Sequence, residues 1–288
     1  MIAKDSLDEL FREARSNDLD AAWTVYADIV SHLPRPRAVP HVWPYDAARP
    51  LLERAGNLVG TQDAERRVLM LTNPALKAPF TTDTLYAGLQ LILPGEVARA
   101  HRHTSFALRF IIEGSNAYTA VGGEKVMMNP GDLVLTPSFE YHDHGNESGK
   151  PMIWLDGLDI ALYQWIPANF ANGYAEARYP AEPAPQPSRL LYPWHEMQAR
   201  LAAQPGTFAT LDYAYRPTAG PISPTIGASA ERVAAGSEGP RRLETASSIY
   251  HVVAGHGKTT VEGTTLEWRE RDTFAIPAWH GYAHTNLG

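Results

Sequence analysis

The 288-residue chain contains no cysteine, which excludes disulfide bonds, thiolate metal sites and a cysteine nucleophile. No apolar run approaches the roughly 18 residues of a membrane span, and the polar, acidic N-terminus MIAKDSLDELFREARSNDLD is unlike a secretory signal. The 25 lysines and arginines stand against 32 acidic residues, a net charge of −7, and no basic run occurs. Because phosphate binding needs clustered cations, we expect no nucleic-acid partner. Since neither a membrane span nor a secretory signal is found, we expect a cytoplasmic protein without a membrane partner.

Proline is abundant, with 23 residues, and favours strands, turns and stiff loops over long helices. Apolar stripes predict helices within residues 5–31, divided near Asn17 and Asp18. The prolines between residues 34 and 50 predict that the chain continues after these helices as an extended arm. From Arg66 onwards, short apolar segments end at proline or glycine without intervening helices, which indicates an antiparallel sandwich or barrel.

Two stretches of the chain share one pattern. RFIIEGSNAYTAVGGEKVMMNPGDLVLTPSFEYHDHGN lines up with YHVVAGHGKTTVEGTTLEWRERDTFAIPAWHGYAHTN, and both alternate strands and turns before a proline, an aromatic residue, a histidine and an asparagine. This indicates an internal duplication. We expect an all-β protein with an N-terminal arm at 1–65, a first barrel at 66–166, a linker at 167–207 and a second barrel at 208–288.

Four histidines form two pairs, each with one residue between its members. In an extended segment residues i and i+2 share a face, so His101 and His103 can reach one ion together. The second pair, His142 and His144, follows Pro137. Neutral imidazole suits Zn, Cu, Fe and Ni, so two pairs in one barrel predict a metal site. The alternative is surface or cross-strand histidines without a metal.

The spacing around these histidines resembles the two cupin motifs. The matching residues are Gly95, His101 and His103 in the first motif, and Gly131, Pro137, His142 and Asn146 in the second. The glutamate ligand of the first motif is replaced by Ala107, so the resemblance implies three histidine ligands and no carboxylate. Three neutral ligands leave a divalent ion its full charge and three positions for an anionic substrate and O2, as in non-haem Fe(II) oxygenases.

The segments PGEVARAHRHTSFALRFIIEG, NPGDLVLTPSFEYHDHGNE and WLDGLDI resemble the gentisate 1,2-dioxygenase group of bicupins, which includes salicylate and 1-hydroxy-2-naphthoate dioxygenases. The resemblance implies two double-stranded β-helix (jelly-roll) barrels, a homotetramer and an Fe(II) cofactor. It also implies cleavage of an aromatic 2-hydroxy acid by O2 between its carboxyl- and hydroxyl-bearing carbons. Gentisate, giving maleylpyruvate, is the expected substrate, with salicylate and 1-hydroxy-2-naphthoate as alternatives.

Two further classes are weighed against a dioxygenase. A metal-dependent cupin isomerase or decarboxylase is disfavoured by the missing glutamate at Ala107. A binding cupin without catalytic activity is disfavoured by the retained histidine triad. Metal content separates the binding protein from the two enzymes, and dependence on O2 separates the two enzymes from each other.

Three charged or polar residues near the histidines are candidates for the reaction. Strand parity places Arg109 on the ligand face, where it can pair with a substrate carboxylate, and the resemblance implies the same role; the alternative is an outward surface arginine. We interpret His144 as a hydrogen-bond partner of substrate or superoxide rather than a ligand, or else as a loop histidine in solvent. Asp156 lies among apolar residues and needs a partner. It orients His144, acts on a substrate hydroxyl or forms a structural ion pair.

Tyr86, Gly88 and Gln90 alternate along one strand and so share a face. Gln90 can donate a hydrogen bond to the substrate, Gly88 leaves room beside Gln90, and Tyr86 can shape the pocket for the aromatic ring. The alternative is that these residues lie on an edge strand and have no functional role. Arg66 or Arg67 can give a second carboxylate contact, and the resemblance implies an arginine in this region. Because the two arginines are adjacent, only one can point inward.

The second barrel holds other residues where the first has its metal-binding histidines, namely Arg242, Glu244 and Tyr282. We therefore expect no metal there and a structural role in packing and oligomerisation. The strand at Met152–Ile160 also has no counterpart in the second barrel. Either the sequence is truncated or another segment closes this barrel.

Overall fold

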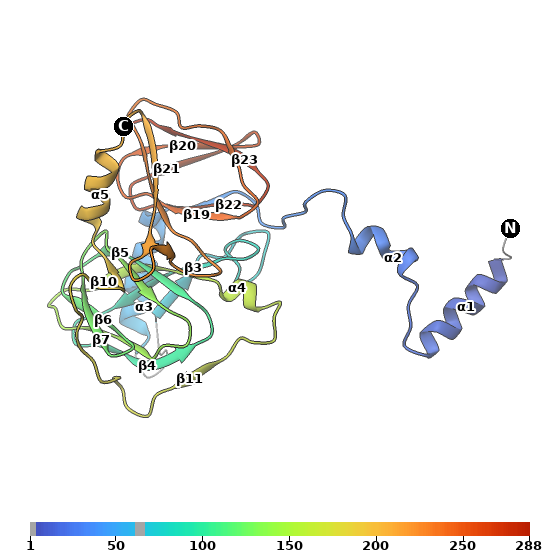
Figure 1. Ribbon diagram of the computed structural model, residues 1–288, viewed down its shortest axis with the longest axis horizontal. Helices are drawn as coiled ribbons and strands as arrows, with labels where there is room; N and C mark the ends of the chain where they lie inside the picture. The colour runs from blue at the N-terminus through green and yellow to red at the C-terminus, as the bar shows by residue number, and fades with distance from the viewer. Residues whose placement is uncertain (1–3, 61–66) are drawn as a thin grey trace. The chain divides into compact units, whose positions relative to one another are not determined.

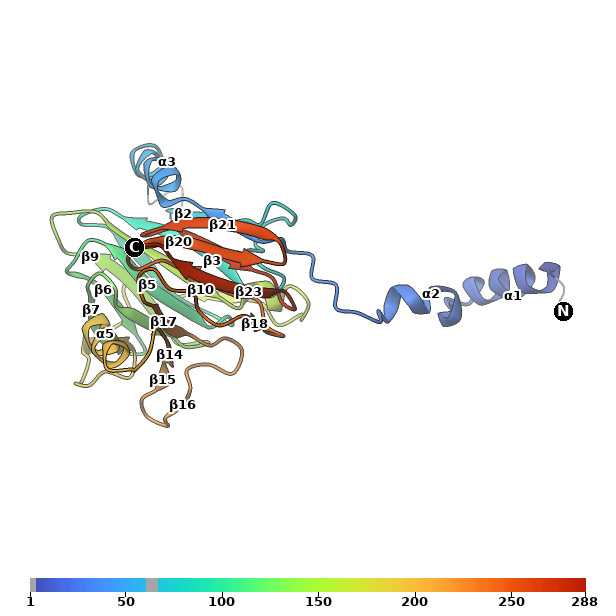
Figure 2. The same cartoon turned by 90° about the horizontal axis from the view of Figure 1, so that it is seen from above.

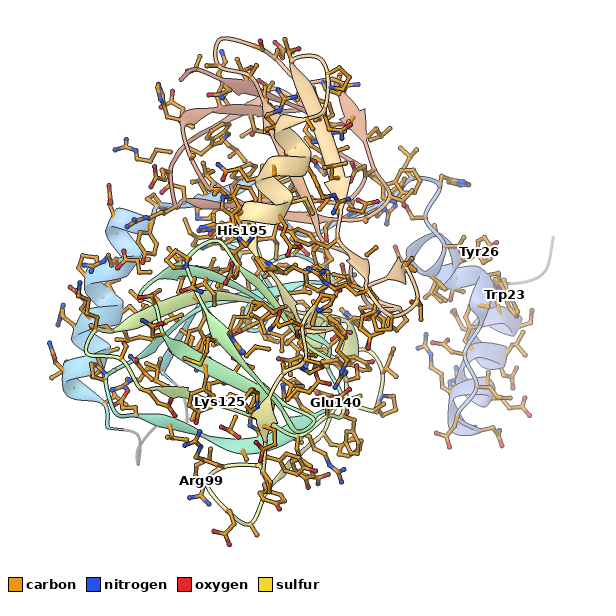
Figure 3. All side chains as sticks on the ribbon, turned by 60° about the vertical axis from the view of Figure 1, so that its left-hand side comes forward. Trp23, Tyr26, Arg99, Lys125, Glu140 and His195 are labelled. Atoms are coloured by element: carbon orange, nitrogen blue, oxygen red, sulfur yellow. The ribbon has the colours of Figure 1, made fainter. Side chains whose placement is uncertain are left out.

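A computed structural model describes residues 4–60 and 67–288, and the chain divides into two compact units at Arg35 and Pro36. The first unit contains helices α1 (Lys4–Ser16) and α2 (Ala22–Ile29), drawn in blue in Figure 1. The predicted helices and their division near Asp18 are confirmed. Trp23 and Tyr26 project from α2 and are exposed (Figure 3). In the described residues, no helix is long and apolar enough to cross a membrane.

The first barrel consists of two six-stranded sheets, drawn mainly in cyan and green in Figure 1, with the strands between residues 171 and 192 in yellow. One sheet has the order β13 (Leu191–Tyr192), β8 (Leu133–Thr136), β5 (Ala107–Glu113), β10 (Met152–Leu158), β3 (Tyr86–Ile92) and β2 (Arg67–Met70). The other has the order β11 (Ala171–Gly173), β4 (Val97–His103), β9 (His142–Asn146), β6 (Ala117–Val121), β7 (Glu124–Met128) and β12 (Glu182–Pro183). Apolar residues of both sheets, including Ile111 and Val121, pack in one buried core. A short helix, α4 (Ile160–Tyr163), follows β10.

The second barrel repeats this arrangement with fewer strands, drawn in orange and red at the top of Figure 1. Its four-stranded sheet is β18 (Arg242–Leu243), β23 (Gly281–Asn286), β20 (His256–Val261) and β21 (Thr264–Arg269); β19 (Ser248–His251) and β22 (Thr273–Ile276) belong to a second sheet. The strand register matches that of the first barrel. Arg242 pairs with Tyr282 as His101 pairs with His142. The predicted all-β fold with an internal duplication is therefore confirmed.

Two similar segments, each a short strand followed by a helix, connect the two barrels. In each segment the strand pairs with one barrel and the helix leads into the other. The two segments are β1 (His41–Trp43) with α3 (Tyr45–Leu58), and β13 with α5 (Trp194–Ala202). Strand β1 precedes the first barrel in the chain but pairs with β22 of the second, whereas β13 follows the first barrel and pairs with its β8. Figure 2 shows α3 and α5 on opposite sides of the second unit. Each barrel thus carries an edge strand whose helix leads into the other barrel.

Two aspartates at corresponding positions of the barrels each accept a hydrogen bond from the first residue of one of these helices. Asp272 of the second barrel accepts a hydrogen bond from Tyr45 N at 2.8 Å, and Asp132 of the first accepts one from Trp194 N at 3.0 Å. These contacts satisfy donors at the helix N-termini that the preceding prolines cannot cap with a side chain. Both aspartates also close the turn in which they lie.

The second barrel accepts β1 from the N-terminal part of the chain, so another segment does add to it. In the part of the chain that the structure describes, no strand pairs with β19 as β10 pairs with β5. The strands between the barrels form small sheets: β14 (Phe208–Asp212) with β17 (Ser229–Val233), and β15 (Ala214–Tyr215) with β16 (Gly220–Pro221). The predicted domain boundaries at 66, 166 and 207 stay predictions, while residues 36–58 lie with the barrels.

Candidate metal centre

Three predicted ligands meet at the junction of strands β4 and β9. One potential ligand atom each from His101, His103 and His142 lies within 4.8 Å of the others. The register explains this, because His101 lies directly opposite His142 in the antiparallel pair and His103 lies two residues further along β4. His142 is buried, and the other two histidines are partly buried. No other such group of three is found among the described residues.

Backbone carbonyls hold all three rings in the same tautomer. Nδ1 lies 2.9 Å from Arg99 O in His101, 2.8 Å from Ser105 O in His103, and 2.9 Å from Glu140 O in His142. A carbonyl only accepts, so each neutral ring donates from Nδ1 and carries its lone pair on Nε2. This is the arrangement that orients histidines toward a metal. The three residues therefore fit a divalent ion, with Ala107 in place of a carboxylate.

A buried ion pair lies next to His144, whose ring neighbours that of the predicted ligand His142. Arg109 Nη2 is 2.9 Å from Asp156 Oδ1, and Trp154 Nε1 donates to Asp156 Oδ2 at 3.0 Å. Burial lowers the pKa of Arg109, and Asp156 opposes this shift by stabilising the cation. Of the alternatives for Asp156, the structure therefore shows an ion pair, formed with a residue that itself contacts His144.

The guanidinium of Arg109 also determines the tautomer of His144. Nη1 of Arg109 lies 3.1 Å from His144 Nδ1 and 3.0 Å from Thr119 Oγ1. Since a guanidinium only donates, His144 Nδ1 accepts and the proton of the neutral ring resides on Nε2. Thr119 completes the cluster at 3.0 Å from the same Nδ1. His144 is thus presented as a hydrogen-bond donor, the reverse of the three neighbouring histidines.

Thr119 is a member of this cluster that was not among the residues predicted from the sequence. Two signals were available: Thr119 is polar within the buried segment AYTAV, and its counterpart Thr259 contacts His284 in the second barrel as Thr119 contacts His144. The duplication therefore preserves the threonine–histidine pair, although the second barrel has different residues in place of the ligands.

Gln90 and Gly88 lie on the interior face of β3. They are opposite Trp154 and Asp156 of β10, and Gln90 is buried. Tyr86 shares this face, and its hydroxyl covers Gly88: a Cβ added at Gly88 would lie 2.5 Å from it. Gly88 therefore makes room for the Tyr86 side chain.

Arg67 belongs to the opposite face of the sheet. It lies opposite Leu91, and its guanidinium forms an ion pair with Glu96 and donates to the carbonyls of Gly56 and Val59 at 3.2 Å. These contacts join β2 to the end of α3. Of the two predicted arginines, Arg67 therefore does not share the face of Gln90, and Arg66 lies outside the described residues.

Comparison with known proteins agrees with this geometry. Residues 88–158 match the cupin domain family. The chain is 35% identical to gentisate 1,2-dioxygenase 1 of Aquipseudomonas alcaligenes, covering 96% of this chain and 88% of the relative. It is 33% identical to 1-hydroxy-2-naphthoate 1,2-dioxygenase of a Nocardioides species, over 98% and 81%.

The chain belongs to the gentisate 1,2-dioxygenase family. A solved structure of salicylate 1,2-dioxygenase from Pseudoaminobacter salicylatoxidans, with adducts of gentisate, superposes with a TM-score of 0.89 at 30% identity, covering 100% of this chain and 89% of that one. Membership of this dioxygenase family makes the protein a ring-cleaving oxygenase. The resemblance inferred from the motifs is confirmed.

Proposed function

We propose that the protein is an Fe(II)-dependent gentisate 1,2-dioxygenase that opens the ring between the carboxyl- and hydroxyl-bearing carbons to give maleylpyruvate. The observation that carries this proposal is the set of three histidines with one tautomer and converging ligand atoms, in a member of this family. His101, His103 and His142 would hold the iron. Bound there, the iron would supply a path for electrons between the substrate ring and O2.

His144 has the role of a hydrogen-bond donor in this proposal. Arg109 keeps the proton on Nε2, so the ring can donate to an oxygen atom that gains negative charge during the reaction. The ring centroid lies 5.5 Å from that of His142, which places this donor beside the ligand cluster. The predicted contact between Arg109 and the substrate carboxylate stays a prediction; its hydrogen bonds support a positioning role.

The interior face of β3 is proposed to bind the aromatic ring. Gln90 offers an amide to a carboxylate or hydroxyl group, and Tyr86 over Gly88 bounds the space in which a ring could lie. Gentisate is favoured because a gentisate 1,2-dioxygenase is among the relatives and a related structure holds gentisate adducts. Salicylate and 1-hydroxy-2-naphthoate remain the alternatives.

Oxygen consumption tests the proposal. Protein reconstituted with Fe(II) is mixed with gentisate, salicylate or 1-hydroxy-2-naphthoate, and O2 uptake is followed together with the absorbance of the ring-opened product. We expect the fastest uptake with gentisate and none in a His142→Ala variant. Absence of uptake with all three acids, from folded and iron-loaded protein, would contradict the proposal and favour an isomerase or binding cupin.

A homotetramer is the proposed assembly. The first unit exposes apolar side chains, among them Leu19, Trp23 and Ile29, which are more than 60% exposed. Large exposed apolar groups are typical of protein contacts. Sedimentation equilibrium of the full chain and of a variant with Trp23→Ser and Ile29→Ser tests this: we expect a tetramer that the variant weakens.

A further inference from the structure

A cavity that the histidine triad does not line lies between the two barrels. The inter-barrel cavity has a volume of about 1550 Å³, and its walls include Leu108 and Phe110 of the first barrel and Tyr250, Trp268 and Phe274 of the second. The three aromatic rings of the second barrel stack in series, with centroids 5.1 Å and 6.1 Å apart. Small-molecule sites are commonly concave and mainly apolar, with a few polar groups placed to orient the ligand.

The polar end of the cavity is built from the positions that correspond to the metal site. Arg242, in the place of His101, forms two parallel hydrogen bonds with Glu231, at 2.6 Å and 2.8 Å. Glu244, in the place of His103, accepts from the hydroxyl of Tyr282 at 3.0 Å. One cation thus faces two carboxylates, so this end of the cavity disfavours an anionic ligand.

Besides Arg242 Nε, the buried nitrogen in this group that has no hydrogen-bond partner among the described residues belongs to His284. Its side chain is only 6% exposed, and it lines the cavity. Nδ1 lies 2.7 Å from Thr259 Oγ1, which already accepts from Trp268 Nε1 at 2.9 Å. The buried hydroxyl needs an acceptor for its own hydrogen, and Nδ1 provides one, so the ring proton is on Nε2.

Nε2 of His284 has no hydrogen-bond partner among the described residues. The nearest carboxylate oxygen, Glu231 Oε2, is 3.9 Å away, which is too long for a direct bond. Burial lowers the pKa of His284 to about 3, so the ring is neutral at physiological pH and Nε2 is a simple donor. One oxygen atom that both accepts and donates can satisfy His284 and Glu231 together, and a hydroxyl group has this capacity.

We propose that the inter-barrel cavity binds an uncharged phenol, with its hydroxyl between His284 and Glu231 and its ring against Tyr250, Trp268 and Phe274. The hydroxyl accepts from His284 Nε2 and donates to Glu231 Oε2. This site differs in chemistry from the triad, because the ligand is neutral and no metal takes part. A water molecule can make the same two hydrogen bonds but leaves the aromatic walls in contact with solvent.

Calorimetric titration of the full chain tests the proposal. Phenol is titrated into iron-loaded protein, with anisole, which cannot donate, and benzoate, which is charged, as comparison ligands. His142→Ala protein, in which the triad is broken, is titrated in parallel. We expect saturable binding of phenol in both proteins, weaker binding of anisole, and no competition from benzoate for the phenol site.

Substitution of the donor locates the site. His284→Phe keeps a ring but removes the donor, and we expect phenol to bind at least about tenfold more weakly. His280→Phe, in the same barrel but outside the cavity lining, is the matched control and keeps full affinity. Equal affinity in the wild type and His284→Phe, or displacement of phenol by benzoate, would overturn the proposal. Absence of saturable binding up to the solubility of phenol would show a cavity filled by water only.

If the His284→Phe variant fails to fold, a measurement on the wild-type protein still tests the proposal. In protein labelled with ¹⁵N-histidine, phenol should shift the Nε2 resonance of His284, assigned by its loss in a conservative His284→Gln variant. His280 lies outside the cavity lining and serves as an internal reference. No change at His284 when phenol is saturating would overturn the proposal.

Discussion

Arg109 and His144 form a buried hydrogen bond of 3.1 Å that links an ion pair to the metal-binding cluster. The same guanidinium is 2.9 Å from Asp156, and both charged residues are at least nine-tenths buried. Because the guanidinium cannot accept, the bond determines which nitrogen of His144 carries the proton. Arg109 thus decides whether His144 donates or accepts beside the ligand cluster.

Loss of this bond is expected to slow the reaction without releasing iron. Arg109→Met alone would leave Asp156 buried and unpaired, so the double variant with Asp156→Leu is the cleaner form. We expect kcat to fall by about 10- to 100-fold, because His144 is no longer held as a donor. O2 uptake and iron content measure the two effects. The exposed Arg54→Met on α3 is the control, and unchanged kcat in the double variant would contradict the positioning role.

Removal of one triad member is expected to abolish metal binding. In His103→Ala the site keeps two imidazoles, which hold a divalent ion much less tightly than three. Iron measured after dialysis should fall to a background level, and activity should fall with it. His280→Ala, in the second barrel, should retain iron. Full iron content in His103→Ala would show that this histidine is not a ligand.

Asp272 is expected to stabilise α3 from a distance of more than 200 residues in sequence. Asp272→Ala removes the acceptor for Tyr45 N, and the loss of a helix cap costs about 1–2 kcal/mol of unfolding free energy. Urea denaturation measures this cost. The neighbouring surface variant Glu270→Ala should change the free energy little, and equal stabilities for the two variants would count against the cap.

His251 is expected to make the fold sensitive to acid. Burial lowers its pKa from 6.5 to about 3, so the folded protein excludes a proton that the unfolded chain binds. This contribution is fully present above pH 6.5 and declines as the pH falls toward 3, by about 1.4 kcal/mol per pH unit. Thermal unfolding of the wild type and His251→Gln from pH 7 to pH 4 isolates the effect. The variant should lose less stability over this range; parallel curves would refute the prediction.

Gly88→Ala is expected to change substrate preference. The added Cβ would lie 2.5 Å from the Tyr86 hydroxyl and 2.7 Å from Val68 Cγ1, so the tyrosine ring has to move. We expect the ratio of kcat/KM between gentisate and 1-hydroxy-2-naphthoate to shift by about tenfold, the scale of a one-carbon change in a pocket. Gly149→Ala, where no atom lies within 4 Å of the added Cβ, is the control. An unchanged ratio of kcat/KM values would contradict the proposal that Tyr86 bounds the pocket for the aromatic ring.

The duplicated all-β fold and the pairing of His101 with His103 followed from the sequence pattern, because strand parity and turn residues are local properties of the chain. The addition of His142 to this pair followed from the resemblance to the cupin motifs. The sequence also indicated that Asp156 needs a partner. It could not identify Arg109 as that partner, since the choice depends on which strands become neighbours in the sheet. The register of β5 beside β10 decided it.

The way in which the two barrels are joined depends on contacts that form only in the folded chain. Strand β1 pairs with β22 across more than 200 residues, and no local pattern in the sequence announces such a pairing. The same holds for Arg67, whose side chain contacts the end of α3 on the face of the sheet opposite to that of Gln90. It also holds for the tautomer in which His144 is a donor. Each depends on groups that approach only after the chain has folded, because hydrogen bonds between distant residues leave no periodic signal in the sequence.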